Sequence, residues 1–323
     1  MSAAGAKRKG GRIVLYAALA GNLLVAVTKF VAATVTGSSA MLSEAVHSTA
    51  DTSNEVLLLY GEHRSRKAPD AAHPLGYGRE VYFWSFMVSV MLFALGAGVS
   101  FWEGVRHVMA PEPIERPEVN YIVLAISAAL ESGSWWFAFR ELRRRMAGRG
   151  FLETARETKD PATIMVFLED TAALIGIAIA AAGIGASEFL GEPIYDGMAS
   201  IGIGVLLAAV ALFTARENKQ LLIGEAARPS LVESIGRIAR AEPGIAAYNG
   251  LLTIQLAPHE VVAALSIDFD DDLRASQVQG IVKRLEAHIR ERHPEVVMVF
   301  VKPQEPDVYR RAHERWMAGP PEG

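Results

Sequence analysis

The sequence contains no cysteine, so it can form neither a disulfide nor a thiolate metal site. Any metal ligand must therefore be a histidine, an aspartate, a glutamate or a backbone group. Charge is scarce over long stretches, since 51% of the 323 residues are hydrophobic and the mean hydropathy is +0.21. The apolar residues form long runs between charged, Pro-rich or Gly-rich segments. This distribution is typical of a polytopic α-helical membrane protein.

Six segments are long and apolar enough to cross a bilayer as helices, because its hydrocarbon core needs about 20 such residues. These spans are residues 13–36, 39–62, 81–104, 119–139, 162–185 and 195–215. Lys and Arg are absent from the connections between spans 1 and 2 and between spans 5 and 6. They are abundant in the N-terminal tail and in the connections between spans 2 and 3 and between spans 4 and 5. The positive-inside rule therefore predicts cytosolic N- and C-termini.

The two ends of the chain differ from this pattern. Residues 1–12 form a basic cytosolic tail without a small-residue cleavage site, which predicts no cleaved signal peptide. After a linker at 216–226, residues 227–303 alternate in the order helix, strand, strand, helix, strand. This order predicts a small ferredoxin-like αββαβ domain on the cytosolic side. Residues 304–323 are expected to be a flexible tail.

Ionisable side chains interrupt the apolar spans at one depth. In span 2, Glu44, His47 and Asp51 follow one another at spacings of three and four, on one helix face. At 1.5 Å per residue, Asp51 lies about 18 Å from the outer end of its helix. Glu131 in span 4 and Glu169 with Asp170 in span 5 lie at nearly the same depth. Intramembrane carboxylates are costly and usually line a substrate path or pair with one another.

A histidine with carboxylates, and no thiolate, suits a borderline divalent metal such as Zn²⁺. Mn²⁺ and Fe²⁺ remain alternatives, with more carboxylate ligands expected. The spacing of His47 and Asp51 lets both side chains reach one ion from a single helix. Lys29, the intramembrane lysine, is expected to form a structural pair with Asp196 at the outer start of span 6.

Several motifs resemble those of the cation diffusion facilitator family of metal/proton antiporters. Residues 21–51 carry an Asn and a Lys in span 1, a Gly-Ser turn and then HxxxD in span 2. HPLGYGREV (73–81) resembles the family's loop before span 3, and YDGMASIGIG (195–204) resembles its sixth span. FLEDTAALIGIAIAA (167–181) is similar to the branch typified by zinc transporter 9.

The resemblance implies a homodimer with a mid-membrane metal site built from spans 2 and 5 and a regulatory cytosolic domain. His47 and Asp51 inherit the ligand roles by position. Span 5 departs from the family pattern because Val166 stands where a histidine is common. The remaining ligand is therefore Asp170 or Glu169, which cannot both point inward because neighbours differ by 100° around a helix. Asp170 is favoured. Glu131 is a further candidate ligand, and Asn22 a candidate for hydrogen bonding to a ligand.

Two other metal sites of the family lack part of their ligands. In the loop between spans 2 and 3, Asp70 and His73 remain, but Tyr77 replaces the second histidine. In the small domain, the positions of the usual histidines hold other residues: Ser266, Phe300 and Lys302. His259 and the acidic run 268–272 are expected to be solvated loop residues.

The resulting hypothesis is a divalent metal efflux transporter, most simply a Zn²⁺/H⁺ antiporter that works by alternating access. Histidine changes charge between pH 5 and 8 and binds metal when neutral, so His47 is the natural proton carrier. No resident cofactor is expected. A membrane metalloenzyme is disfavoured because no HExxH motif is present. A receptor or scaffold that acts through residues 227–303 is a further alternative. A bacterial inner membrane is the expected location.

Overall fold

A computed structural model describes residues 3–146 and 161–318 of the chain. Within them the chain forms two compact units. The first contains the helices up to Lys219, without the loop Lys67–Arg79, and the second contains that loop and the chain from Gln220 onward. Much of the connection between spans 4 and 5, which bears on the predicted orientation, lies outside the described residues.

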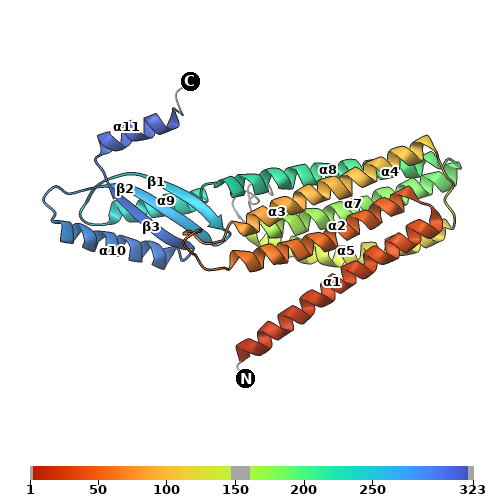
Figure 1. The fold of residues 1–323 in the computed structure, drawn as a ribbon, viewed down its shortest axis with the longest axis horizontal. Coiled ribbons are helices and arrows are strands. Elements are labelled where there is room, and N and C mark those ends of the chain that lie inside the picture. Colours follow the sequence, from red (N-terminus) through yellow and green to blue (C-terminus); the bar gives the residue numbers. More distant parts are fainter. Residues whose placement is uncertain (1–2, 147–160, 319–323) are drawn as a thin grey trace. The chain divides into compact units, whose positions relative to one another are not determined.

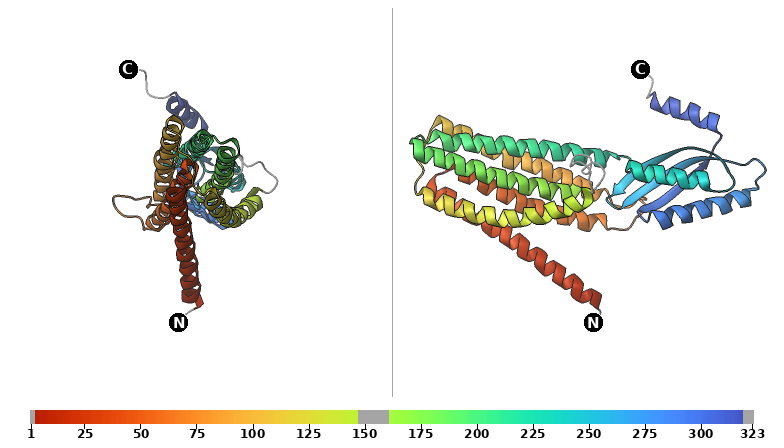
Figure 2. Two further views of the ribbon diagram at one scale, coloured as in Figure 1. Left: turned by 90° about the vertical axis from the view of Figure 1, so that its right-hand side faces the viewer. Right: turned by 180° about the vertical axis from the view of Figure 1, so that it is seen from behind.

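The first unit is a bundle of long helices (Figure 1). Its elements are α1 (Ala3–Thr36), α2 (Ser39–Ser65), α3 (Glu80–Met91), the π-helical segment η1 (Leu92–Ala97), α4 (Gly98–Met109), α5 (Pro117–Met146), α7 (Pro161–Leu190) and α8 (Ile194–Ile223). Since α3, η1 and α4 are continuous, they form one long helix from Glu80 to Met109. All six predicted spans are therefore helices. In Figure 2 the N-terminal part of α1 diverges from the other helices.

Five of these helices are long and apolar enough to cross a membrane, counted over the described residues only. They lie at Leu19–Thr36, Glu80–Met109, Pro117–Arg144, Ile164–Leu190 and Ile194–Ile223. The helix that does not qualify is α2, although residues 39–62 were predicted as a span. Its polar residues lower its hydropathy, and many of them, including Glu44, His47 and Asn54, are buried. It is a helix whose polar stripe faces its neighbours rather than lipid.

The core of the bundle is built from small and branched side chains. Alanines of α1, α2, α7 and α8 pack with Leu92, Ile184, Ile203 and Leu207. Conversely, large apolar side chains such as Leu24, Phe137 and Leu212 are exposed on the outside of the bundle. This inside-out distribution is expected where lipid covers the surface.

The predicted linker at 216–226 is mostly helical. Helix α8 continues to Ile223 and ends at Gly224, whose φ of +115° suits a glycine at a helix C-terminus. The predicted span ends at residue 215, and the predicted linker begins at Arg216, where charged residues begin. Charge does not stop a helix that leaves the apolar zone, whereas a left-handed glycine does.

The second unit contains the predicted αββαβ order. The elements are α9 (Pro229–Ala241), β1 (Ile245–Ala257), β2 (Glu260–Phe269), α10 (Ala275–Arg292) and β3 (Val296–Pro303). The sheet order is β1-β2-β3, with β1 antiparallel and β3 parallel to β2. One face of the sheet packs on α9 and α10 through residues such as Leu231, Ile235, Leu265, Leu285 and Ile289. The fold-class prediction is confirmed for this part.

The expected flexible tail at 304–323 is wrong over most of its length. Residues Pro306–Met317 form helix α11, with Pro306 in the first turn. Tyr309 packs against Gly250 of β1, where a Cβ would clash with its hydroxyl. Val308, Ala312 and Trp316 recur every four residues, a helical spacing that the prediction passed over.

Candidate functional site

Helix α2 presents the central ionisable groups of the bundle. Its first turn is capped by Ser38, whose hydroxyl accepts a hydrogen bond from the Met41 amide at 3.1 Å. His47 is completely buried, and neither ring nitrogen has a hydrogen-bond partner among the described residues. Its Nδ1 lies 3.4 Å from Oδ1 of Asp51, and that oxygen also lacks a hydrogen-bond partner in the part of the chain that the structure describes. Buried polar groups without partners are costly, so this pair is a candidate for binding a ligand.

The distance between these two atoms fits a shared metal ion. Two ligand atoms on a tetrahedral Zn²⁺, each bonded at 2.0–2.1 Å, are about 3.3 Å apart. A hydrogen bond between the same atoms would bring them to about 2.8 Å. The observed 3.4 Å is close to the edge of such a tetrahedron. The donor types and their spacing therefore suit the divalent cation predicted from the sequence.

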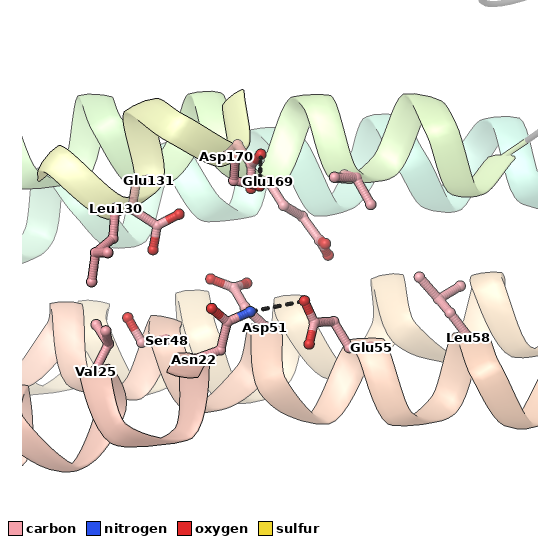
Figure 3. Close-up of a pocket in the computed structure, with 12 residues that line it drawn as sticks. Asn22, Val25, Ser48, Asp51, Glu55, Leu58, Leu130, Glu131, Glu169 and Asp170 are labelled. Carbon is pink, nitrogen blue, oxygen red and sulfur yellow. Dashed lines mark hydrogen bonds between the residues drawn. The ribbon is translucent and has the colours of Figure 1, made fainter. Parts of the chain in front are cut away.

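Beside this pair lies a cavity of about 90 Å³ between α1, α2, α5 and α7 (Figure 3). This volume is several times the 10–15 Å³ that one water molecule needs. Five carboxylates line it: Asp51, Glu55, Glu131, Glu169 and Asp170. Neither a lysine nor an arginine is among the described residues that line it, and His47 lies beside the cavity rather than on its wall. A cavity of this composition attracts cations.

Both carboxylates of α7 line the cavity, so the expectation that only one could face it is wrong. Glu169 is directed towards α2 and accepts a hydrogen bond from Asn54 Nδ2 at 2.8 Å. Asp170 accepts one from Ser134 Oγ of α5, also at 2.8 Å. The cavity lies between α2 and α5, so two neighbouring side chains of α7 reach it from different directions.

Glu131 lines the cavity as predicted for a fourth-span carboxylate at this depth. Asn22 donates to Glu55 Oε1 at 2.8 Å and so holds a carboxylate that is not among the predicted ligands. Glu55 follows Asp51 by four residues, so the spacing that singled out His47 and Asp51 would have found it too.

Over residues 3–146 and 161–318, no three His, Asp or Glu side chains are close enough together to hold a metal ion. The predicted metal ligands His47, Asp51, Asp170 and Glu169 are therefore gathered around one region without forming a closed coordination shell. His47 and Asp51 are adjacent, whereas the α7 carboxylates bond to Asn54 and Ser134. For all four predicted ligands to bind one metal ion, Glu169 and Asp170 would have to give up their hydrogen bonds to Asn54 and Ser134.

Lys29 does not pair with Asp196, and that prediction is wrong. Its ammonium lies 3.0 Å from Glu44 Oε2 and donates to Ser48 Oγ at 2.8 Å, all within the buried interior. The reason is depth. Lys29 is about 10 Å from the end of α1, whereas Asp196 is only about 3 Å from the start of α8. Glu44, about 8 Å into α2, is at the matching level.

Asp196 instead holds the N-terminus of α2. Its carboxylate accepts hydrogen bonds from Ser38 Oγ at 2.7 Å, the Ser39 amide at 2.5 Å and the Ala40 amide at 3.4 Å. A carboxylate is stabilised at a helix N-terminus by unpaired amides and by the helix dipole. Asp196 therefore ties the beginning of α2 to the beginning of α8.

In the second unit, the loop before α3 contains a lysine ammonium at the incomplete metal site of Asp70 and His73. The Lys67 ammonium lies 3.0 Å from Asp70 Oδ2, donates to Tyr77 OH at 2.7 Å and lies 4.1 Å from the centre of the Tyr77 ring. Tyr77 OH donates to the same Asp70 oxygen at 2.7 Å. The hydrogen bonds from Tyr77 and Lys67 lower the pKa of Asp70 and keep it ionised.

Replacing Asp70 by asparagine is expected to loosen this loop, because both donors lose their charged acceptor. Trypsin should then cleave after Lys67 several-fold faster near pH 8, as followed by intact-protein mass spectrometry. Asp271→Asn, in the turn after β2, is the matched control and should leave this cleavage unchanged. Because the pKa of Asp70 is lowered, its contribution is complete above the ordinary value near 3.9 and is lost only below it. An equal cleavage rate in Asp70→Asn contradicts the role of Asp70.

The positions of the usual cytosolic metal site are occupied by a different network. Ser266 pairs with Lys302 across β2 and β3, and Ala264 pairs with Phe300. Ser266 Oγ bonds to Gln304 Oε1 at 3.2 Å. His259 is exposed in the turn after β1, and Asp270 to Asp272 are exposed after β2, whereas Asp268 belongs to β2 itself.

Comparison with known proteins identifies both units. Residues 15–223 match the model of the cation efflux transmembrane domain, and residues 227–304 match that of the cation efflux protein cytoplasmic domain. The chain belongs to the cation efflux family. The resemblance to the cation diffusion facilitator family, drawn from the motifs of spans 1, 2, 5 and 6, is thereby confirmed.

Relatives in this family include a human and a plant protein. The human mitochondrial proton-coupled zinc antiporter SLC30A9 is 36% identical over 264 residues, covering 81% of this chain and 46% of the relative. Metal tolerance protein C4 of Arabidopsis thaliana is 34% identical over 267 residues, covering 81% and 57%. The cation-efflux pump FieF of Cronobacter sakazakii is 26% identical over 291 residues, covering 88% and 90%. The chain thus spans about half the length of the first of these relatives.

Proposed function

We propose that this protein exports Zn²⁺ in exchange for protons by alternating access at the α2–α7 region. The observation that carries the proposal is the pair of His47, which is buried, and Asp51, which is partly buried. Their facing atoms, Nδ1 and Oδ1, lie 3.4 Å apart beside a carboxylate-lined cavity, and neither has a hydrogen-bond partner among the described residues. Support comes from relatives whose names describe a proton-coupled zinc antiporter, a metal tolerance protein and a cation-efflux pump.

In this proposal His47 and Asp51 supply two ligands from α2, and Glu169 and Asp170 supply the others from α7. Glu131 and Glu55 attract the ion into the cavity and balance its charge. Asn54 and Ser134 hold the α7 carboxylates until the ion arrives. Second-sphere hydrogen bonds of this kind orient ligands and tune their affinity for metal.

Protons compete with the ion for the same groups. A neutral imidazole and ionised carboxylates bind metal, whereas their protonated forms do not. When the ion leaves, protons on His47 and on the carboxylates reduce the net charge that would remain in an apolar interior. Exchange of metal for protons therefore avoids the cost of moving uncompensated carboxylates through the bilayer.

Mn²⁺ or Fe²⁺ is the second candidate substrate. The five carboxylates of the cavity favour it, because these ions prefer more oxygen ligands than Zn²⁺ does. The imidazole of His47 favours Zn²⁺ or Fe²⁺ over Mn²⁺. Zinc is placed first because His47 and Asp51 are already at the distance of a tetrahedral edge.

The activity that we assign is transport rather than catalysis. The proposal also includes the oligomeric state, the membrane and the orientation of the chain. We expect a homodimer in a bacterial inner membrane with both termini in the cytosol. The Lys- and Arg-free connection between α1 and α2 and that between α7 and α8 support this orientation. The αββαβ domain, which is the family's cytoplasmic domain, then lies on the cytosolic side. A partner-binding role for that domain is compatible with transport.

The test is ion flux in proteoliposomes of the purified full chain. Zn²⁺ uptake should be driven by an opposing proton gradient and should collapse when an ionophore removes that gradient. Excess Mn²⁺, Fe²⁺ and Co²⁺ are added in turn as competitors. Stronger inhibition by Mn²⁺ or Fe²⁺ than by unlabelled Zn²⁺ reverses the order of the two substrates. Flux that ignores the proton gradient contradicts antiport.

A further inference from the structure

A second cavity lies at the end of the bundle where α1 turns into α2, here called the hairpin end. It has a volume of about 270 Å³ and is lined by residues of the α1–α2 hairpin and of the C-terminal part of α4 and its following loop. Its polar lining residues are Thr34, Ser38, Glu103, Arg106, His107 and Glu112. Arg106 and Glu112 are exposed, so the cavity borders the solvent at this end.

The unusual group in this cavity is His107 of α4. Only 5% of it is exposed, and within residues 3–146 and 161–318 its Nε2 is buried without a hydrogen-bond partner. That nitrogen lies 3.9 Å from Oδ2 of Asp196, the carboxylate that holds the N-terminus of α2. The separation is too long for a hydrogen bond and short enough for a strong charge interaction in a buried setting.

The helices that carry these two residues are held together closely. A Cβ on Gly104 of α4 would lie 2.7 Å from the carbonyl oxygen of Gly197 of α8. One on Gly197 would lie 2.9 Å from the Val108 amide nitrogen. The two glycines therefore let α4 and α8 touch backbone to backbone beside His107 and Asp196. This contact fixes the two side chains opposite each other.

The charged groups around His107 leave Asp196 as its partner. On α4, Glu103 and Arg106 are paired with each other, with Arg106 Nη2 2.6 Å from Glu103 Oε1. Glu112 belongs to the exposed loop after α4, and Thr34 and Ser38 of the hairpin are uncharged. Asp196 is completely buried, and its partners in the described structure, other than His107, are the uncharged donors of Ser38, Ser39 and Ala40.

We propose that His107 is a second proton-binding site, reached from the hairpin end, and that a proton bound there locks this end of the bundle. An imidazolium at His107 gives buried Asp196 the counter-charge that it lacks, so the bonds of Asp196 to the first turn of α2 are strengthened. Neutral His107 leaves that carboxylate uncompensated, and the hairpin end opens more easily. Histidine is the side chain whose charge changes between pH 5 and 8.

This arrangement links proton arrival to the helix that carries His47 and Asp51. In the proposed orientation the hairpin end faces the side to which metal is released. A proton that arrives from that side closes the exit and favours the return of the transport site to the cytosol. This consequence for flux rests on the proposed function, whereas the proton site itself does not.

The absence of native cysteine allows the test on the full chain with two introduced labels. Val35→Cys in α1 and Met198→Cys in α8 are exposed positions for two spin labels. Double electron–electron resonance spectroscopy then measures the distance between the hairpin and α8. In lipid nanodiscs without metal, the shorter-distance population should rise several-fold from about pH 7.5 to about pH 5.5. In His107→Gln most of this pH response should be lost, and in Asp196→Asn also.

Two controls keep the outcome decisive. His63→Gln, at an exposed position near the other end of α2, should keep the full pH response. Thermal unfolding of each variant identifies any that fails to fold, and His107→Gln, which keeps a neutral polar side chain, then carries the test alone. If His107→Gln keeps most of the wild-type pH response, the proposal is overturned. The proposal is also overturned if the distance distribution changes on addition of Zn²⁺ at about pH 7.5 but does not change with pH, since the cavity then binds a metal ion rather than a proton.

In flux assays, His107→Gln should retain proton-driven Zn²⁺ transport and lose part of its dependence on the pH of the release side. If the wild-type chain shows no Zn²⁺ flux, the proposed function is contradicted. The distance measurement still tests the proton site in that case.

Discussion

Replacing Asp51 by asparagine is expected to reduce proton-driven Zn²⁺ flux by more than about 100-fold. Residues that merely hydrogen-bond to a ligand typically cost 10–100-fold in affinity when they are changed, so loss of a ligand should cost more. His47→Ala should have an effect of the same order, because it removes the nitrogen 3.4 Å from Asp51 Oδ1. Initial rates in proteoliposomes at several Zn²⁺ concentrations measure both.

The matched control for His47 is His63→Ala on the same helix. His63 is exposed near the C-terminal end of α2, and its removal should leave flux within about twofold of the wild type. Glu169→Gln and Asp170→Asn are compared in the same assay, and each should reduce flux. Normal rates in both His47→Ala and Asp51→Asn contradict the site assignment. Normal rates in one α7 variant alone restrict the ligand to the other.

The part of this site that depends on local spacing could be predicted from the sequence. Residues four apart on a helix share a face, so His47 and Asp51 had to be neighbours once α2 formed. The same rule reaches Glu55. Depth along each helix also placed Glu131, Glu169 and Asp170 near one plane, and all three line one cavity with Asp51.

The parts that depend on packing between helices could not be predicted. Successive residues of a helix point in directions about 100° apart. This rotation prevents Glu169 and Asp170 from both binding one ion only if the ion lies on a single side of α7. Here Asn54 of α2 and Ser134 of α5 bond to Glu169 and Asp170 from two sides. Similarly, His47 lies behind the cavity wall, which depends on how α2 is rotated against α7. Spacing within one helix carries no information on that rotation.

The fold shows the same division. The αββαβ order follows from alternation and turn residues, and apolar runs identify the predicted spans other than α2, whose polar stripe lowers its hydropathy. The missed helix α11 is short and polar, and it packs on β1 through Tyr309 and Gly250, which are distant in sequence. The sequence signals for α11 are local, but its stability depends on this distant contact.

Lys29 and Glu44 are the clearest case of a pair that only the three-dimensional structure identifies, and their removal should have a large effect on stability. Both side chains are completely buried, and a Cβ on Gly176 of α7 would press against Glu44. Lys29→Met leaves Glu44 as a buried charge without its partner, which costs about 3–5 kcal/mol. The variant should unfold at a clearly lower temperature in detergent, as followed by circular dichroism.

The double variant Lys29→Met with Glu44→Met separates the loss of a charge from the loss of the pair. Two apolar side chains of similar length leave no uncompensated charge, so most of the stability should return. The exposed pair Glu62 and Arg66, treated identically, should change the unfolding free energy by at most about 1 kcal/mol. A double variant as unstable as Lys29→Met contradicts a mutual pairing. If the stable double variant also transports Zn²⁺ normally, Lys29 joins α1 to α2 and takes no part in exchanging metal for protons, which leaves that task to His47 and the cavity carboxylates.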